Sequence, residues 1–121
     1  MTEIKNSKIY DLEDRTLLFA KNTRLFVKKL PRTTSNIEDG KQVVRSSGSV
    51  GANYIEANES LSKKDFVMRI KISRKEAKES RYWFNLLDTN GDINLEKERK
   101  ILIKESEELM KIFSAIMRKS L

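Results

Sequence analysis

Cysteine and histidine are both absent from this chain of 121 residues, and proline occurs only once. Without cysteine the chain can form neither a disulfide framework nor a thiolate metal site. Without histidine it lacks the commonest general base and every nucleophile that histidine activates. These absences exclude most enzyme chemistry, so we expect a protein that is not an enzyme and needs no cofactor or metal.

Long apolar runs are missing as well. No stretch approaches the roughly 20 apolar residues that a membrane-spanning helix needs, and the first residues lack the apolar run of a signal peptide. We therefore expect a soluble, cytoplasmic protein with no membrane partner. The length and the single proline favour one helical domain over residues 1–121.

Positive charge, in contrast, is abundant. The chain has 25 Lys and Arg against 18 Asp and Glu, a formal net charge of +7. Such a balance favours polyanionic partners, nucleic acid above all, although many small basic proteins have none. The placement of the charges along the chain is therefore more informative than their number.

Four segments carry the periodicity of amphipathic helices, with turn-forming residues between them. They span about 10–30, 35–58, 63–87 and 95–119; Pro31 ends the first, and Thr34, Ser35 or Asn36 caps the second. This pattern predicts an all-α fold, an antiparallel up-down four-helix bundle. The expected inward positions are Leu18, Asn22, Leu25 and Phe26, then Val44, Ser47, Gly51, Tyr54 and Ile55, then Phe66, Ile70, Ser73, Ala77 and Phe84, and finally Leu102, Ser106, Leu109, Phe113 and Ile116.

Small residues crowd the middle of the second predicted helix, from Ser46 to Ala52. Each glycine there should cost roughly 1 kcal/mol relative to alanine, so a compensating interaction is expected. Ser47 and Gly51 lie one turn apart, where a neighbouring helix could approach closely. A phosphate-binding loop is the alternative, but no Gly-Lys-Ser/Thr follows the glycines and no strand is evident before them.

One flank of the third predicted helix is basic, spans about 100° of the helical wheel and includes Tyr82. Such a face can bind phosphates, but a run of charges is more often an ordinary solvated surface. A single aromatic residue adds only a small platform for base stacking. The candidate nucleic-acid-binding residues are Lys64, Lys71, Arg74, Lys75 and Lys78.

The opposite flank of the same helix is apolar beyond the stripe that one core requires. Exposed alone, it would form an unfavourable patch, which predicts an interface between copies of the chain. The candidate interface residues are Ile72, Glu76, Glu79, Trp83 and Leu87.

The glutamates of this flank have two possible uses. They can form ion pairs with Arg45 or Arg81, or they can join Glu56 and Glu59 in a carboxylate metal site. Bundle metal sites of the di-iron type draw Glu-x-x-His motifs from two helices, and this chain has no histidine. Ion pairing is therefore the favoured interpretation.

Residues 88–94, DTNGDIN, place oxygen-bearing side chains at alternate positions, as a calcium-binding loop does. Ile93 stands where such a loop needs glycine, and Arg99 stands where it needs a bidentate glutamate. We expect a turn instead, with Gly91 at positive φ and Asn94 capping the following helix.

Two stretches of the chain form distinctive motifs that amino-acid composition alone would not produce. The sequences VVRSSGSVGANYIEANESLSKKDF, at 43–66, and KEAKESRYWFNLL, at 75–87, closely resemble the four-helix-bundle family associated with intervening sequences of bacterial 23S ribosomal RNA genes. The likeness covers essentially the whole chain, including LFVKKLP at 25–31 and ELMKIFSAIM at 108–117.

This resemblance implies an antiparallel bundle that assembles as a homopentamer and contacts nucleic acid, expected to be RNA, through a positive surface. The family has no established enzymatic activity. A related accessory protein partners a reverse transcriptase in diversity-generating retroelements, where a basic pentameric barrel binds RNA. The positions that match the family motifs are Arg45, Asn53, Glu56, Glu76, Glu79 and Trp83. The resemblance is compatible with a role for them in packing or in binding.

Three functions are compatible with these patterns. The leading hypothesis is a non-enzymatic homo-oligomer that binds nucleic acid through phosphate contacts, which a ring of subunits would multiply. The second is an adaptor whose oligomer binds a protein such as a reverse transcriptase. An enzyme would have to use carboxylates with Mg²⁺ or a lysine, and no convincing group of this kind is present.

Overall fold

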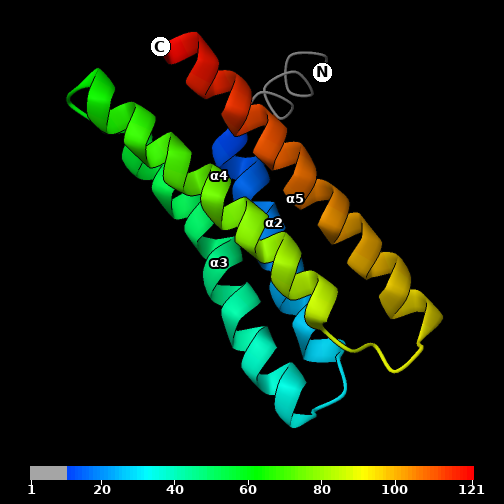
Figure 1. Cartoon of the computed structure of the whole chain (residues 1–121). Helices are drawn as coiled ribbons and strands as arrows, with labels where there is room; N and C mark the ends of the chain where they lie inside the picture. Colours follow the sequence, from blue (N-terminus) through cyan, green and yellow to red (C-terminus); the bar gives the residue numbers. More distant parts are fainter. Residues whose placement is uncertain (1–10) are drawn as a thin grey trace.

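A computed structural model describes residues 11–121 of the chain, so the predicted helix start at Tyr10 lies outside the described residues. Within that range the chain forms no strand and four α-helices: α2 (Leu12–Lys29), α3 (Thr34–Asn58), α4 (Lys63–Leu86) and α5 (Ile93–Ser120). The α2–α3 and α4–α5 connections lie at one end of the molecule and the α3–α4 turn lies at the other (Figure 1). The expected antiparallel up-down four-helix bundle is confirmed. None of these helices is long and apolar enough to cross a membrane.

Each of these helices begins at a residue whose side-chain oxygen caps it. Asp11, Thr33, Ser62 and Asp92 each accept a hydrogen bond, 2.9 to 3.2 Å long, from the amide three residues further on. Each bond satisfies an amide that has no partner within its helix. The predictions of a cap between Thr34 and Asn36, and of a cap at Asn94, were therefore too late in the chain.

Asn36 has another role, because its side chain is buried and joins the two connections at one end of the bundle. Its Nδ2 donates to the carbonyls of Pro31, at 2.9 Å, and Asp88, at 2.8 Å. Its Oδ1 accepts from the amide of Asp88 at 2.9 Å. The α2–α3 and α4–α5 connections are thus fixed to each other by one amide group.

Four phenylalanines occupy the centre of the bundle: Phe19, Phe26, Phe84 and Phe113. The ring of Phe84 on α4 meets Phe19 and Phe26 of α2 edge to face, with centroids 6.1 and 6.2 Å apart. This geometry brings the positive edge of one ring to the negative face of another. The aromatic contacts therefore join α2 to α4 across the core.

The inward positions of α4 and α5 agree with the predictions. Phe66 and Ile116 are partly buried against the core, and the other predicted positions are buried. The confirmed buried positions are Ile70, Ser73, Ala77 and Phe84 on α4, and Leu102, Ser106, Leu109 and Phe113 on α5.

Helix α2 turns a different face inward from the one predicted. Leu18, Asn22 and Leu25 are exposed, and Phe26 alone of the predicted positions is buried. The residues that fill the core from α2 are Leu12, Thr16, Phe19, Thr23 and Phe26.

Two threonines explain the error on α2. The hydroxyl of Thr16 donates to the Leu12 carbonyl at 2.9 Å, and that of Thr23 donates to the Phe19 carbonyl at 2.8 Å. Because these hydroxyls are satisfied within their own helix, they are buried without an unmade hydrogen bond. Polar residues thus occupy the core stripe while two leucines lie outside it.

The prediction for α3 is also partly wrong. Ser47 is buried as expected, but Val44, Gly51 and Tyr54 are only partly buried and Ile55 is exposed. The helix is turned so that its buried positions contact both α2 and α4. These positions are Asn36, Gly40, Val43, Ser46, Ser47, Val50 and Ala57.

Close packing at the small residues of α3 is confirmed. A Cβ atom added at Gly51 would lie 2.7 Å from the Thr16 hydroxyl oxygen on α2, closer than real Cβ atoms approach. On the side of α4, Ser46 and Ser80 share a hydrogen bond of 2.8 Å, and Ser73 donates to the Val50 carbonyl at 2.9 Å. Since the glycines lie within a helix, their amides bond to that helix and cannot form a phosphate-binding loop.

The loop before α5 is a turn, as expected. Gly91 has a φ of 75° and Asn90 a φ of 55°, both in the left-handed region that such turns use. From α5, Arg99 reaches back to the carbonyl groups of Phe84, at 3.2 Å, and Leu87. The guanidinium thus satisfies carbonyl groups at the end of α4, which have no partner within the helix.

Ion pairs support the interface between α2 and α5. Arg15 binds Glu105 through two bonds of 2.8 Å, and Lys29 binds Glu98 at 2.7 Å. The hydrogen bond to Glu105 raises the pKa of Arg15 above its usual value, although partial burial opposes this shift. The contacts close the ring of helices between its first and last members.

We predict that the two neighbouring glycines of α3 respond differently to substitution. Gly48→Ala should raise the free energy of unfolding by up to about 1 kcal/mol, because its Cβ meets only the flexible Arg24 side chain, at 3.4 Å. Gly51→Leu should lower it by about 1–3 kcal/mol or more through overpacking against Thr16. Denaturant unfolding of both variants measures the difference, and equal stabilities would contradict close packing at Gly51.

Candidate nucleic-acid interface

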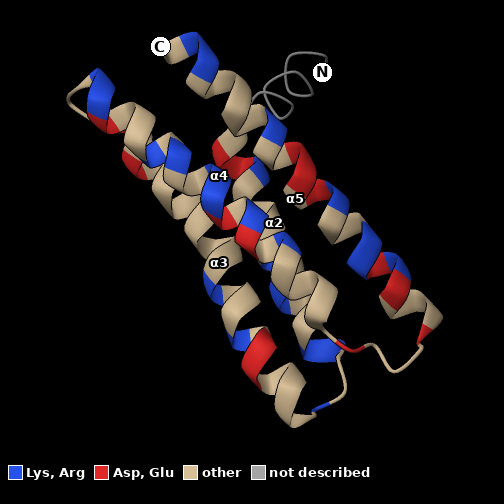
Figure 2. Cartoon of the chain, viewed as in Figure 1, with Lys and Arg blue, Asp and Glu red and all other residues tan. Residues whose placement is uncertain are grey.

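The basic flank of α4 points away from the core. Because Ile70, Ala77 and Phe84 are fully buried, the residues on the opposite side of the helix must face solvent. Lys and Arg recur along α4 (Figure 2). The exposed lysines of this surface, which we call the α4 lysine face, are Lys64, Lys71, Lys75 and Lys78.

No lysine of the α4 lysine face forms an ion pair with another described residue. Arg74, the fifth residue predicted for this site, is partly buried and turns toward α5. Its Nη1 lies 3.5 Å from the Ser114 hydroxyl. The structure therefore brings the four lysines together on one surface and places Arg74 at the edge of it.

Beside the α4 lysine face, a groove of about 600 Å³ runs between α4 and α5. Arg81 of α4 lies on one wall, where its Nη1 is 3.4 Å from Glu107 of α5. Sequence patterns did not indicate that α5 takes part, because its charges of both signs resemble an ordinary solvated helix. The lining residues are Arg81, Glu107, Met110, Lys111, Ser114 and Arg118.

Tyr82 is 58% exposed on the outer side of α4. Its ring meets Trp83 edge to face, with the centroids 5.0 Å apart and the planes at 75°. The Trp83 indole nitrogen in turn donates to Glu79 at 3.0 Å. These contacts hold the tyrosine ring in place at the end of the lysine face.

The predicted ion pairing of the motif glutamates is confirmed. Arg45 of α3 binds Glu79 and lies 3.4 Å from the Glu76 carboxylate oxygen, which is buried and receives no hydrogen bond from another described residue. The other expected partner, Arg81, binds Glu107 instead. No group of three or more potential metal ligands occurs within residues 11–121.

Two further motif residues lie on α3. Asn53 accepts a hydrogen bond from Arg69 of α4 at 3.0 Å and donates to the Ser49 carbonyl at 2.9 Å. Glu56 is exposed. The motif residues that make side-chain contacts therefore join α3 to α4 along the flank predicted to be an interface.

One residue of that flank is misplaced by the helical wheel. Leu87 is only 2% exposed and belongs to the core of its own chain, so it offers no surface to a second copy. The helix ends at Leu86, and the extended backbone at Leu87 turns its side chain inward. Ile72 and Trp83 remain partly accessible.

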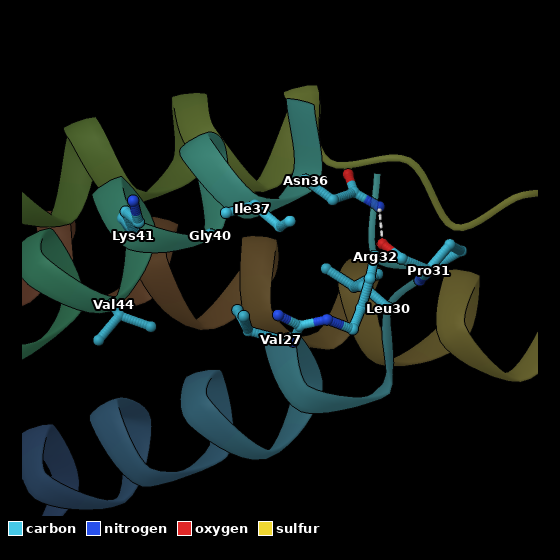
Figure 3. Close-up of a pocket in the computed structure, with 9 residues that line it drawn as sticks. All are labelled: Val27, Leu30, Pro31, Arg32, Asn36, Ile37, Gly40, Lys41 and Val44. Atoms are coloured by element: carbon cyan, nitrogen blue, oxygen red, sulfur yellow. Dashed lines mark hydrogen bonds between the residues drawn. The ribbon is translucent and has the colours of Figure 1, made fainter. Parts of the chain in front are cut away.

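A second hollow, of about 270 Å³, lies between α2 and α3 near their connection (Figure 3). Val27, Leu30 and Val44 give it an apolar lining, to which Arg32 and Lys41 add two cations. No carboxylate lines it, and it lies on the opposite side of the ring of helices from the α4–α5 groove. The α4 side is still the stronger candidate for binding polyanions, because it gathers four exposed lysines on one surface and this hollow has only two cations.

The fold and this surface define the class of protein as an antiparallel four-helix bundle with a basic face. The chain belongs to the 23S rRNA-intervening sequence protein family, whose model matches residues 9–115. The resemblance seen in the sequence is thereby confirmed.

A solved structure gives a second comparison. The chain is similar to a protein of unknown function from the S23 ribosomal protein family of Bacteroides thetaiotaomicron, with 31% identity and a TM-score of 0.76. The match covers 87% of this chain and 96% of that one. The comparison with curated proteins gives no match. Neither the family nor the solved structure indicates an enzymatic activity.

We predict that the pairing of Arg45 with Glu76, whose Oε1 atom is buried, stabilises the contact between α3 and α4. Arg45→Met should lower the free energy of unfolding by about 1–3 kcal/mol, because it leaves a buried carboxylate without its cation. Adding Glu76→Gln to that variant should restore part of the stability. Denaturant unfolding of both single variants and the double variant tests this, and strictly additive effects would contradict the coupling.

Proposed function

We propose that the protein is a non-enzymatic homo-oligomer that binds nucleic acid through phosphate contacts on α4, with RNA as the expected ligand. The observation that carries this proposal is the α4 lysine face, which is exposed and forms no ion pair within the described residues. Elsewhere in the bundle, Arg15, Lys29 and Arg45 have carboxylate partners, whereas Lys21 and Lys28 of α2 have none among the described residues. What distinguishes α4 is that four such lysines follow one flank of the helix. An unpaired row of lysines repels itself, and a polyanion would relieve that repulsion.

The length of the row suits a nucleic-acid backbone. At about 1.5 Å per helical residue, Lys64 and Lys78 lie about 21 Å apart along α4, which is about six nucleotides of one strand at about 3.4 Å each. Lysine presents a flexible point charge and no fixed pattern of donors that could read a base edge. Binding should therefore depend weakly on sequence and strongly on salt.

Self-assembly is the second part of the proposal. Leu17, Leu18 and Leu25 of α2 are each more than half exposed, and the exposed Ile55 of α3 and Ile101 of α5 flank that helix. Clustered apolar side chains of this kind favour association. A pentamer is the assembly implied by the resemblance to the family, and it would multiply a modest affinity for phosphate in each subunit.

The same apolar side chains favour one alternative, an adaptor that docks a protein such as a reverse transcriptase. A helical or other apolar surface of that partner would cover α2 in place of a second copy. This alternative needs no contact between the α4 lysine face and nucleic acid. The two functions are therefore separated by variants of α4.

We predict that changing Lys71, Lys75 and Lys78 together to Gln weakens binding to a single-stranded RNA oligonucleotide. The negative slope of log K against log salt should become shallower by about 0.7 for each phosphate that is no longer neutralised. The matched control changes Lys21, Lys28 and Arg32 to Gln, which removes the same charge from exposed positions of α2 and its connection. Fluorescence anisotropy across a salt series measures both, and equal effects of the two triple variants would contradict a specific role for α4.

We predict that light scattering at micromolar concentration gives a mass that is a multiple of 14.1 kDa, and five times that value for the pentamer. Changing Leu18 and Leu25 to Glu should reduce the mass toward that of one subunit. Leu61→Glu is the control, because Leu61 is fully exposed at the α3–α4 turn. A monomeric parent protein would refute self-assembly, and dissociation on Ile72→Glu alone would place the interface on the α4 flank instead.

A further inference from the structure

We propose that the groove between α4 and α5 holds the backbone of a single nucleic-acid strand, with α5 supplying a second basic wall and Tyr82 stacking against an unpaired base. This inference rests on the proposed function and extends it to residues outside the α4 lysine face. The groove lies between Arg81 on α4 and Lys111, Ser114 and Arg118 on α5.

The charges of the groove favour a phosphate diester. Arg81 and Glu107 bind each other across it at 3.4 Å, and both side chains are more than one third exposed. Lys111 is 3.4 Å from Glu108, with 76% of its side chain exposed. Exposed pairs of this length contribute little, so an entering phosphate can replace them. Arg118 has no carboxylate partner among the described residues, which leaves the groove with a surplus of positive charge.

The groove lies beside the α4 lysine face, because Arg81 on its wall is less than one helical turn from Lys78. Arg74 does not line the groove, but its guanidinium lies 3.5 Å from Ser114 of α5, which does. Lys78 lies one turn from Arg74 and nearly one turn from Arg81 along α4, so it stands between the two arginines. A nucleic-acid backbone lying in the groove would therefore meet cations of α4 on one side and of α5 on the other, along about two helical turns.

Tyr82 points to a single strand and not to a duplex. It follows Arg81 directly, it is 58% exposed, and its edge-to-face contact with Trp83 leaves a ring face available. Trp83 is itself fixed by its bond to Glu79, so the platform is ordered before a ligand arrives. Stacking on such a platform requires a base that is free of its partner, as in single-stranded RNA or DNA.

The test compares two double variants of the full chain by fluorescence anisotropy with a labelled 20-nucleotide oligouridine. Changing Lys111 and Arg118 to Gln should weaken binding about tenfold or more at moderate salt and lower the salt slope by about 0.7 for each phosphate that the groove no longer neutralises. The control changes Lys21 and Lys28 of α2 to Gln and should alter neither quantity to that extent. Thermal unfolding and light scattering establish that fold and assembly are unchanged.

A second pair of variants tests the stacking. Tyr82→Ala should weaken binding of the oligouridine roughly 5- to 100-fold, whereas Tyr82→Phe should keep it, because the aromatic face and not the hydroxyl binds the base. Neither change should affect binding of an RNA duplex of the same length. Equal weakening on duplex and single strand would overturn the single-strand assignment.

The outcomes separate this inference from the proposed function. If the parent chain binds neither oligonucleotide, the proposed function fails and the inference fails with it. If the parent chain binds and the lysine variants of α4 weaken binding, but the Lys111 and Arg118 variant equals its control, the proposed function stands and the groove is excluded.

Discussion

The close approach of α3 to both of its neighbours is the constraint on which the bundle depends. On one side Gly51 leaves no room for a Cβ atom beside Thr16 of α2. On the other side Ser46 binds Ser80 of α4, and the Val50 carbonyl accepts from Ser73. Larger residues at these positions would separate the helices, and the phenylalanine rings of the core would then no longer meet. Glycine lowers the intrinsic stability of α3, but at Gly51 it allows the backbone of α3 to approach α2 closely.

This packing determines which surface each helix presents to its surroundings. Once the serine contacts orient α4 against α3, the lysines of the α4 lysine face must lie on the outer side. Arg74 and Arg81 then lie toward α5, and Arg69 lies toward α3. The flank nearest α3 is occupied by the Arg45, Glu79 and Trp83 contacts. The molecule therefore has a basic side at α4 and α5 and an apolar side at α2. The proposed function assigns a polyanion to the first surface and another protein surface to the second.

The buried positions could be predicted from the sequence wherever they follow the spacing of apolar residues, as for Ile70 and Phe84 of α4 and for the inward positions of α5. The prediction failed on α2 because leucines repeat on two faces, and hydroxyls satisfied within the helix allowed threonines such as Thr23 to take the core. It failed at Leu87 because a wheel cannot show where a helix ends. The α4–α5 groove was missed for a third reason: Arg118 and Arg81 become neighbours only through antiparallel packing, which no local pattern displays.

Lysine footprinting tests the central claim, that the α4 side contacts nucleic acid, most directly. The protein is acetylated with and without a saturating single-stranded RNA, and the modification of each lysine is measured by mass spectrometry. We expect Lys71, Lys75 and Lys78 to be protected, whereas Lys21 and Lys28 of α2, which are also exposed to solvent, should react as before. Protection of the α2 lysines with no protection on α4 would contradict the claim.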